Sequence, residues 1–324
     1  MPARNLSYYC SKFENLRRDF KNGGAPHKPI LLISLIQAYQ NGLYQTAEIQ
    51  ILPELVGLFK SNWQWLVETN HQCLFTLPFY YMSSEPFWEL VPNRGCELWI
   101  KSKSPMRSFS NLTTAVKYAK IEEELKELLM NKETSTFLLQ LLLDNYFPNA
   151  KHAVLTTPDY SYLTKIKTQI LQESKQAYQD RLTQIQKELD NEGFQEEVFV
   201  RGGIFKKEVP KIYNYTCCIS CLRIDAGDNI SMVDACHIIP FSESFNDTIS
   251  NGLALCPNLH RALDRGLLSI NEDFRVIVNK NFSEPNLSAY NIKQFEGKQI
   301  RLPLNEHHHP SFESLGYHRK KYGF

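Results

Sequence analysis

The feature that most constrains this chain is a stretch between residues 234 and 264, in which two histidines and an asparagine lie at defined intervals. It contains DACHIIP at 234–240, NGLAL at 251–255 and LHRALD at 259–264. The first segment has the pattern of a short acidic and apolar strand, the second follows a polar loop, and the third has the spacing of a helix. Such a unit gathers polar side chains over a small area, as a hydrolytic site requires.

Phosphodiester hydrolysis needs a base for the water, a cation for the growing phosphorane charge and help for the leaving oxygen. His237 suits the base, because histidine titrates near neutrality, and we expect it to end the second strand of a hairpin. Asn251, in the loop, can hold either the imidazole or the backbone. His260 is expected to face the same cleft from the helix as a metal ligand. Asp234 can assist only if the strand bends, because an extended strand directs it away from His237.

This combination resembles the HNH motif of ββα-metal nucleases, in the branch of McrA-like and other restriction endonucleases. The similarity extends over residues 198–324, ending with GYHR at 316–319. It implies a ββα-metal fold, DNA as the substrate, and hydrolysis with one divalent ion, Mg²⁺ or Mn²⁺. The residues that it marks as catalytic are His237, Asn251 and His260, and the candidate phosphate contacts are Arg261 and Arg265.

One position departs from the family pattern. Many HNH nucleases carry an acidic or histidine ligand immediately before the catalytic histidine, and this chain has Cys236 there. The metal would then rest on His260, the phosphate and waters, with Asp234 as a further ligand if the geometry permits. Mg²⁺ tolerates few protein ligands because it keeps several waters. A sulfur ligand at Cys236 would instead favour Zn²⁺ or another transition metal.

Five of the eight cysteines lie between residues 217 and 256, which raises the question of a structural zinc. Cys218 and Cys221 form a C-x2-C knuckle, and Cys256 is a candidate third ligand. The second knuckle of a four-cysteine site would need a cysteine at position 259, which is Leu259. We therefore expect no structural zinc, and reduced thiols rather than disulfides in a cytoplasmic chain.

The first 150 residues predict helices followed by a short sheet, which is an α+β pattern. A first helix is expected from Leu6 to Phe20, with Asn5 as its cap and Gly23 beyond its end. Further helices are expected over 30–39, after Pro53, over 121–130 and over 135–146, and strands over 74–77, 87–91 and 98–100.

This block is also similar to a known kind of domain. APHKPILL at 25–32, LPF at 77–79 and PFWEL at 86–90 resemble the domain that precedes HNH in many restriction enzymes, and the sulfur-binding domain that reads phosphorothioate DNA. The DNA-binding positions that the resemblance implies are His27, Lys28, Pro86 and Trp88. Glu85 and Glu89 flank the expected apolar cup, and a carboxylate there would repel an anion. The alternative is that His27 and Lys28 open a helix and Trp88 belongs to the core.

Residues 160–192 alternate apolar and polar side chains in the manner of one long amphipathic helix. Such a helix either packs on its own domain or pairs in a coiled coil, and the second case would make a homodimer. We thus expect a DNA-recognition domain over 1–150, a helical connector over 151–197 and an HNH nuclease domain over 198–324.

The net charge of +1 excludes a uniformly basic molecule, so positive charge for DNA must be local. The first twenty residues are too charged for a signal peptide and no apolar run could span a bilayer, so we expect a cytoplasmic protein without membrane contact. These features predict a restriction-type endonuclease that defends against foreign DNA, perhaps one that depends on DNA modification. The alternatives are a defence nuclease whose first domain senses a ligand or partner, and an inactive HNH fold that only binds nucleic acid.

Overall fold

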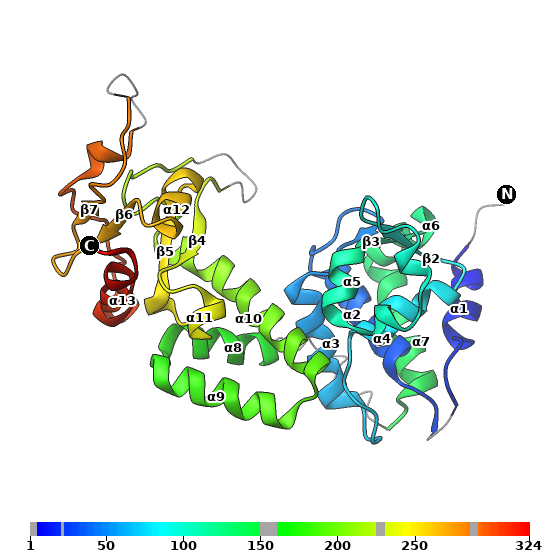
Figure 1. Ribbon diagram of the computed structural model, residues 1–324. Helices are drawn as coiled ribbons and strands as arrows, with labels where there is room; N and C mark the ends of the chain where they lie inside the picture. The colour runs from blue at the N-terminus through cyan, green and yellow to red at the C-terminus, as the bar shows by residue number, and fades with distance from the viewer. Residues whose placement is uncertain (1–4, 21–22, 150–160, 225–230, 286–290) are drawn as a thin grey trace. The chain divides into compact units, whose positions relative to one another are not determined.

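The computed structural model describes residues 5–20, 23–149, 161–224, 231–285 and 291–324 (Figure 1). The chain divides into two compact units. Unit 1 comprises residues 1–165 and 188–200, and unit 2 comprises residues 166–187 and 201–324. Each unit therefore takes a piece of the segment expected to be a connector. Helices with small sheets make the fold α+β, as the sequence predicts.

Unit 1 is built around the apolar helix α2 (His27–Gln40), which is buried along almost its whole length. Its three-stranded antiparallel sheet has the order β1-β3-β2. The remaining elements, in chain order, are α1 (Leu6–Glu14), β1 (Glu48–Ile49), α3 (Pro53–Leu66), α4 (Thr76–Tyr81), β2 (Trp88–Pro92), α5 (Phe109–Ala115), β3 (Val116–Ile121), α6 (Glu123–Met130) and α7 (Lys132–Tyr146), with 3-10 turns η2 (Met82–Ser84), η3 (Trp99–Lys101) and η4 (Pro105–Arg107).

Three local expectations for unit 1 are wrong. Residues 74–77 lead into the helix α4, and residues 98–100 contribute to the 3-10 turn η3, so neither segment is a strand. Short aromatic runs satisfy a helical turn as readily as a strand when tertiary packing favours it. The first helix ends at Glu14, well before Phe20, although Asn5 does cap it by accepting a hydrogen bond from the Tyr8 N–H.

The expected long helix over 160–192 is broken into α8 (Ser161–Gln172), α9 (Lys175–Glu188) and the start of α10 (Asn191–Ile212). Ile170 on α8 and Tyr178 on α9 are fully buried. The apolar stripe is thus covered within this chain, which is the alternative in which the helix packs on its own domain. None of the described helices is long and apolar enough to cross a bilayer.

The centre of unit 2 is an antiparallel hairpin followed by a helix. β4 (Asp234–His237) pairs with β5 (Gly252–Leu255), and α12 (Pro257–Asp264) begins two residues later. His237 therefore ends the first strand of the described hairpin, not the second. The other described elements of unit 2 are α11 (Phe241–Ser244), η6 (Ile249–Asn251), β6 (Leu268–Ile270), β7 (Val276–Val278), η7 (Ile292–Phe295), η8 (Glu306–His308) and α13 (Phe312–Tyr322).

The hairpin packs against α10 through a glycine. Gly252 lies opposite His237 in the register. A side-chain carbon at Gly252 would come within 2.8 Å of Val209 and 3.1 Å of Phe205 on α10. The Asn-Gly pair at 251–252 is thus explained by the close approach of β5 to α10.

Candidate active site

The strand β4 directs its neighbouring side chains to opposite sides of the hairpin. Cys236 is fully buried and contacts Asp264 on α12. His237 lies flat against the Phe205 ring on α10, with ring centroids 3.9 Å apart and planes at 10°. Because side chains alternate along a strand, these two contacts follow from one backbone geometry. The stacking fixes the plane of the His237 imidazole.

A buried carboxylate fixes which nitrogen of His237 is available. Nε2 of His237 lies 2.8 Å from Oδ1 of Asp247, which is 1% exposed. An ionised carboxylate only accepts hydrogen bonds, so Nε2 donates and carries the ring proton. Among the described residues, none lies within hydrogen-bond distance of Nδ1. The His237 side chain is 20% exposed, so Nδ1 is the nitrogen that can accept a proton.

Asp247 is a residue that the sequence reasoning did not identify. The second oxygen of its carboxylate accepts a hydrogen bond of 3.3 Å from the Tyr178 hydroxyl on α9. Burial raises the pKa of Tyr178, so the phenol stays protonated and remains a donor. The Arg201 guanidinium lies 5.4 Å from the Tyr178 ring centroid. No local spacing links these residues to His237, although an aspartate ten residues after a candidate base was a signal worth testing.

Asn251 holds the loop that carries Asp247. Its Oδ1 accepts a 3.0 Å hydrogen bond from the Ile239 N–H, and its amide donates to the carbonyls of Ile239 at 2.9 Å and Asn246 at 3.0 Å. The side chain is completely buried and its printed partners are all backbone groups. Of the two expected roles, the structure supports the backbone one: Asn251 ties the segment after His237 to the residue before Asp247.

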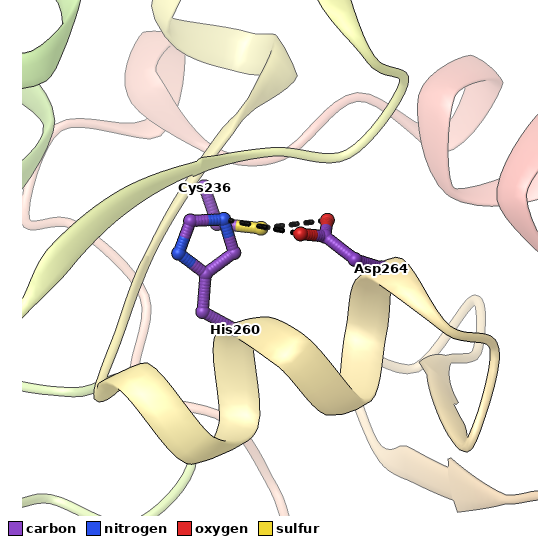
Figure 2. Close-up of side chains that lie close together, drawn as sticks. All are labelled: Cys236, His260 and Asp264. Carbon is purple, nitrogen blue, oxygen red and sulfur yellow. Dashed lines mark hydrogen bonds and ion pairs between the residues drawn. The ribbon is translucent and has the colours of Figure 1, made fainter. Parts of the chain in front are cut away.

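A second cluster lies on the other side of β4. Figure 2 shows Cys236 reaching from the strand towards His260 and Asp264, which project from successive turns of α12. One ligand atom from each of the three lies within 4.8 Å of the others. Nε2 of His260 is 3.5 Å from Asp264, an i,i+4 pair. Of the described His, Cys, Asp and Glu side chains, these three form the one group close enough to share a metal ion.

Asp234 occupies a different place from the one expected of a ligand. Its carboxylate is 3.4 Å from Nδ1 of His260, while Nε2 of the same ring faces Asp264. A carboxylate on the far nitrogen commonly orients a metal-bound imidazole and fixes its tautomer. The geometry therefore separates Asp234, behind His260, from Asp264, in front of it.

The donor set fits a divalent ion with some affinity for sulfur. A nitrogen, a carboxylate and a thiol suit Mn²⁺ or a later transition metal better than Mg²⁺, which prefers oxygen. Burial raises the pKa of Cys236, and the nearby Asp264 charge raises it further. The thiol is thus protonated until a cation displaces the proton.

The remaining cysteines do not assemble the zinc site considered from the sequence. Cys218 is fully buried and Cys221 is exposed, and among the described residues no metal-holding group includes either. Cys256 instead hydrogen-bonds Cys217, and this contact lowers the pKa of Cys217 to about 5. The two thiols pair with each other and not with the C-x2-C knuckle.

Arg261 and Arg265 are both exposed on or just after α12, as phosphate contacts would be. The positions expected to bind DNA in unit 1 need correction. Trp88 is 3% exposed and donates its indole N–H to the Phe79 carbonyl, so it belongs to the core. The Lys28 ammonium is buried in an ion pair with Glu85.

His27 and Pro86 remain near the surface of unit 1. His27 lies at the start of α2, with Nε2 2.9 Å from the Gln72 carbonyl and its ring against Trp63. Burial lowers its pKa to about 4, so the ring is neutral at pH 7 and offers no charge to a phosphate. Pro86 is exposed.

The comparison with known families matches residues 217–271 to the HNH endonuclease family. Residues 217–271 are an HNH endonuclease domain. The match contains the whole β4-β5-α12 unit with His237, Asn251 and His260. Members of such families hydrolyse nucleic acid, so this domain has the fold of a nuclease, and HNH nucleases in general use a divalent metal.

One solved structure that resembles this chain is a modification-dependent TagI restriction endonuclease, at 25% sequence identity and a TM-score of 0.27. The similarity covers 36% of this chain and 36% of that one, so it spans about a third of either protein. No curated protein matches the chain.

Proposed function

We propose that this protein is a restriction-type endonuclease that hydrolyses DNA phosphodiester bonds at the HNH domain, with His237 as the general base. The observation that carries the proposal is the His237 ring itself. Asp247 holds Nε2 at 2.8 Å, Phe205 holds the plane of the ring, and Nδ1 is left to accept a proton. A base whose tautomer and orientation are set in advance needs no rearrangement when it takes the proton of water.

The cluster on α12 is the proposed metal site. His260 through Nε2 and Asp264 through its carboxylate would hold one divalent ion, with Cys236 as a third ligand and Asp234 orienting His260 from behind. Such an ion supplies neutralisation of negative charge on the phosphate and its leaving oxygen. We expect Mn²⁺ to support more activity than Mg²⁺, because sulfur is a soft donor.

The chain's own residues then divide the work. Arg261 and Arg265 are exposed beside the cluster and bind the phosphate backbone. Nδ1 of His237 removes the proton from the attacking water, and Asp247 stabilises the imidazolium that forms. Because Cys236 and His237 are adjacent at the end of β4, we place the scissile phosphate at that end of the strand.

Unit 1 is proposed to select the DNA, and this selection depends on modification in one form of the proposal. The support is indirect: the whole chain has a net charge of only +1, so an HNH domain without a strong basic excess binds DNA weakly by itself. A second candidate is a nuclease that is silent until unit 1 binds a small ligand or a partner protein.

Plasmid cleavage tests the proposal. The full chain should nick or linearise supercoiled plasmid with Mn²⁺ or Mg²⁺, and EDTA should stop it. The substitution His237→Ala should lower the rate by about 10²–10⁴-fold, the usual contribution of a general base. His307→Ala, at an exposed histidine outside the site, is the matched control and should cleave normally.

The same assay separates the alternatives. Cleavage by His237→Ala at the normal rate would refute the base assignment. Intact plasmid with every metal, but tight DNA binding, would favour the inactive HNH fold. Testing unmodified, methylated and phosphorothioated DNA shows whether modification matters, and cleavage that begins only on adding a ligand would favour the sensor.

A further inference from the structure

A cavity of about 500 Å³ lies in unit 1, between the start of α2, the helix α4 and the turn η4. Its size is within the range of about 300–1,000 Å³ that small-molecule sites occupy. The wall is divided by chemistry. One part carries the cations Arg17, Arg18 and Arg107, and another part carries Leu77, Pro78 and Tyr81 from α4. The functional proposal for the HNH domain uses none of these side chains.

Two of the cations are available for a ligand. Arg17 and Arg107 are exposed, and within the described ranges no acidic side chain is in ion-pair distance of either guanidinium. Lys28 also lines the cavity, but its charge is taken by the buried carboxylate of Glu85 at 2.5 Å. Glu85 accepts the Arg17 backbone N–H as well, at 3.0 Å, which fixes the backbone beneath the Arg17 side chain.

Arg18 is held in place by its surroundings. Its guanidinium donates to the Ala25 carbonyl at 3.4 Å and lies 4.4 Å from the Tyr146 ring centroid. A guanidinium that is stacked and hydrogen-bonded keeps its charge in a fixed position, so it contributes field to the cavity without needing to move. Asp19 is the one acidic residue of the cavity wall, and the cations outnumber it.

The start of α2 adds a second source of positive potential. The helix runs for 14 residues, and no side chain caps its N-terminus. Its first residues, His27 and Lys28, form part of the cavity wall. Unbonded N–H groups at a helix start favour an anion, and three neighbouring arginines reinforce that preference.

The apolar part of the wall limits which anion fits. Tyr81 presents an aromatic ring beside Pro78 and Leu77, and these groups gain nothing from a bare inorganic ion. Arginine with an aromatic platform is the usual combination for single nucleotides, since the base stacks and the phosphate is paired. An acidic peptide would use the arginines but not a flat apolar wall.

We propose that this cavity accepts one nucleotide of a DNA strand, with its phosphate against Arg17 and Arg107 and its base against Tyr81. The proposal rests on the proposed role of unit 1 in selecting DNA, and it names the residues that make the selection. A base can enter only after leaving the helical stack, which costs least for a mismatched, modified or single-stranded base. The cavity would thereby read the base in isolation. A free mononucleotide has the same chemistry and is the other source to be tested.

Binding is measured by fluorescence anisotropy with the full-length His237→Ala protein, which does not cut the probe. Arg17→Ala combined with Arg107→Ala should weaken binding of a single-stranded oligonucleotide about tenfold or more and reduce the salt slope by about two, one for each lost phosphate contact. Tyr81→Leu should weaken binding without changing the slope. Arg94→Ala, an exposed arginine of unit 1 outside the cavity, is the matched control.

Each outcome decides the matter. If the double arginine variant binds like Arg94→Ala, the cavity takes no nucleotide phosphate. If deoxyadenosine monophosphate binds the wild-type protein in calorimetry while DNA affinity is insensitive to the double variant, the ligand is a free nucleotide and the DNA form is wrong. Thermal melting should be unchanged by substitution of either exposed arginine. Cleavage is not needed here, so failure of the nuclease proposal would appear separately, in the plasmid assay.

Discussion

The role of Asp247 makes the sharpest prediction from this structure. Its two oxygens face different donors, Nε2 of His237 at 2.8 Å and the Tyr178 hydroxyl at 3.3 Å. Asp247→Asn keeps the size of the side chain but replaces one oxygen with an NH₂ group. If the amide oxygen keeps the Tyr178 hydrogen bond, the NH₂ group faces Nε2 and donates to it. The ring proton then moves to Nδ1, and the base can no longer accept a proton from water.

The expected loss has two parts. A hydrogen bond to a charged group contributes about 1 kcal/mol more than a neutral one, and losing that difference as the imidazolium forms costs about tenfold in rate. A change of tautomer removes general-base catalysis itself, which is worth about 10²–10⁴-fold. We therefore expect Asp247→Asn to lower kcat by at least about tenfold, and by up to about 10⁴-fold if the tautomer changes.

The assay is plasmid cleavage at saturating Mn²⁺, with DNA binding and thermal melting measured on the same protein. DNA affinity should stay normal, because Asp247 is buried and does not face the DNA. Asp273→Asn, at an exposed aspartate of unit 2, is the control and should leave kcat unchanged. A kcat for Asp247→Asn within twofold of wild type, with the protein folded, would refute the reasoning.

Three further predictions follow from other parts of the molecule. Cys236→Asp should shift the preferred metal from Mn²⁺ towards Mg²⁺, because an oxygen donor replaces sulfur; an unchanged ratio of Mg²⁺- to Mn²⁺-supported cleavage would argue against Cys236 as a ligand. Asn251→Ala should lower the free energy of unfolding in urea by about 3 kcal/mol, since buried backbone groups lose their partners; a change below about 1 kcal/mol would contradict its structural role. The pKa of His27, lowered to about 4, means that the folded state resists protonation, so stability is complete above about pH 6.5 and falls as the pH drops towards 4. Melting curves of His27→Gln should show less of this acid sensitivity, and equal sensitivity would show that other groups are responsible.

Much of the nuclease site could be predicted from the sequence, because its parts are local. Alternation along a strand and the i,i+4 repeat of a helix relate neighbouring residues without any knowledge of the fold. The strand that ends in His237 and the helix that carries His260 could therefore be expected from spacing alone, and the family match covers both. The expectation that Asp234 points away from His237 has the same local origin, and the two residues do contact opposite sides of the hairpin.

Other features depend on contacts between distant residues, and the sequence did not determine them. Residues 160–192 have one amphipathic pattern, yet they form separate helices because the fold of unit 2 covers their apolar faces. Trp88 has the composition of a recognition residue, and only packing against Phe79 shows that it is core. Charge pairing hid Lys28 in the same way, because its partner Glu85 is far along the chain.

The sequence by itself thus determined the kind of chemistry, through residue types at spacings that bring them onto one hairpin and one helix. Only the tertiary structure decided which groups tune that chemistry. Asp247 reaches His237 because Asn251 ties down the loop between them, and Asp264 joins Cys236 because α12 packs on β4. Loop closure and packing select these pairs from many that the chain could form, and their free energy depends on the whole fold and not on any local pattern.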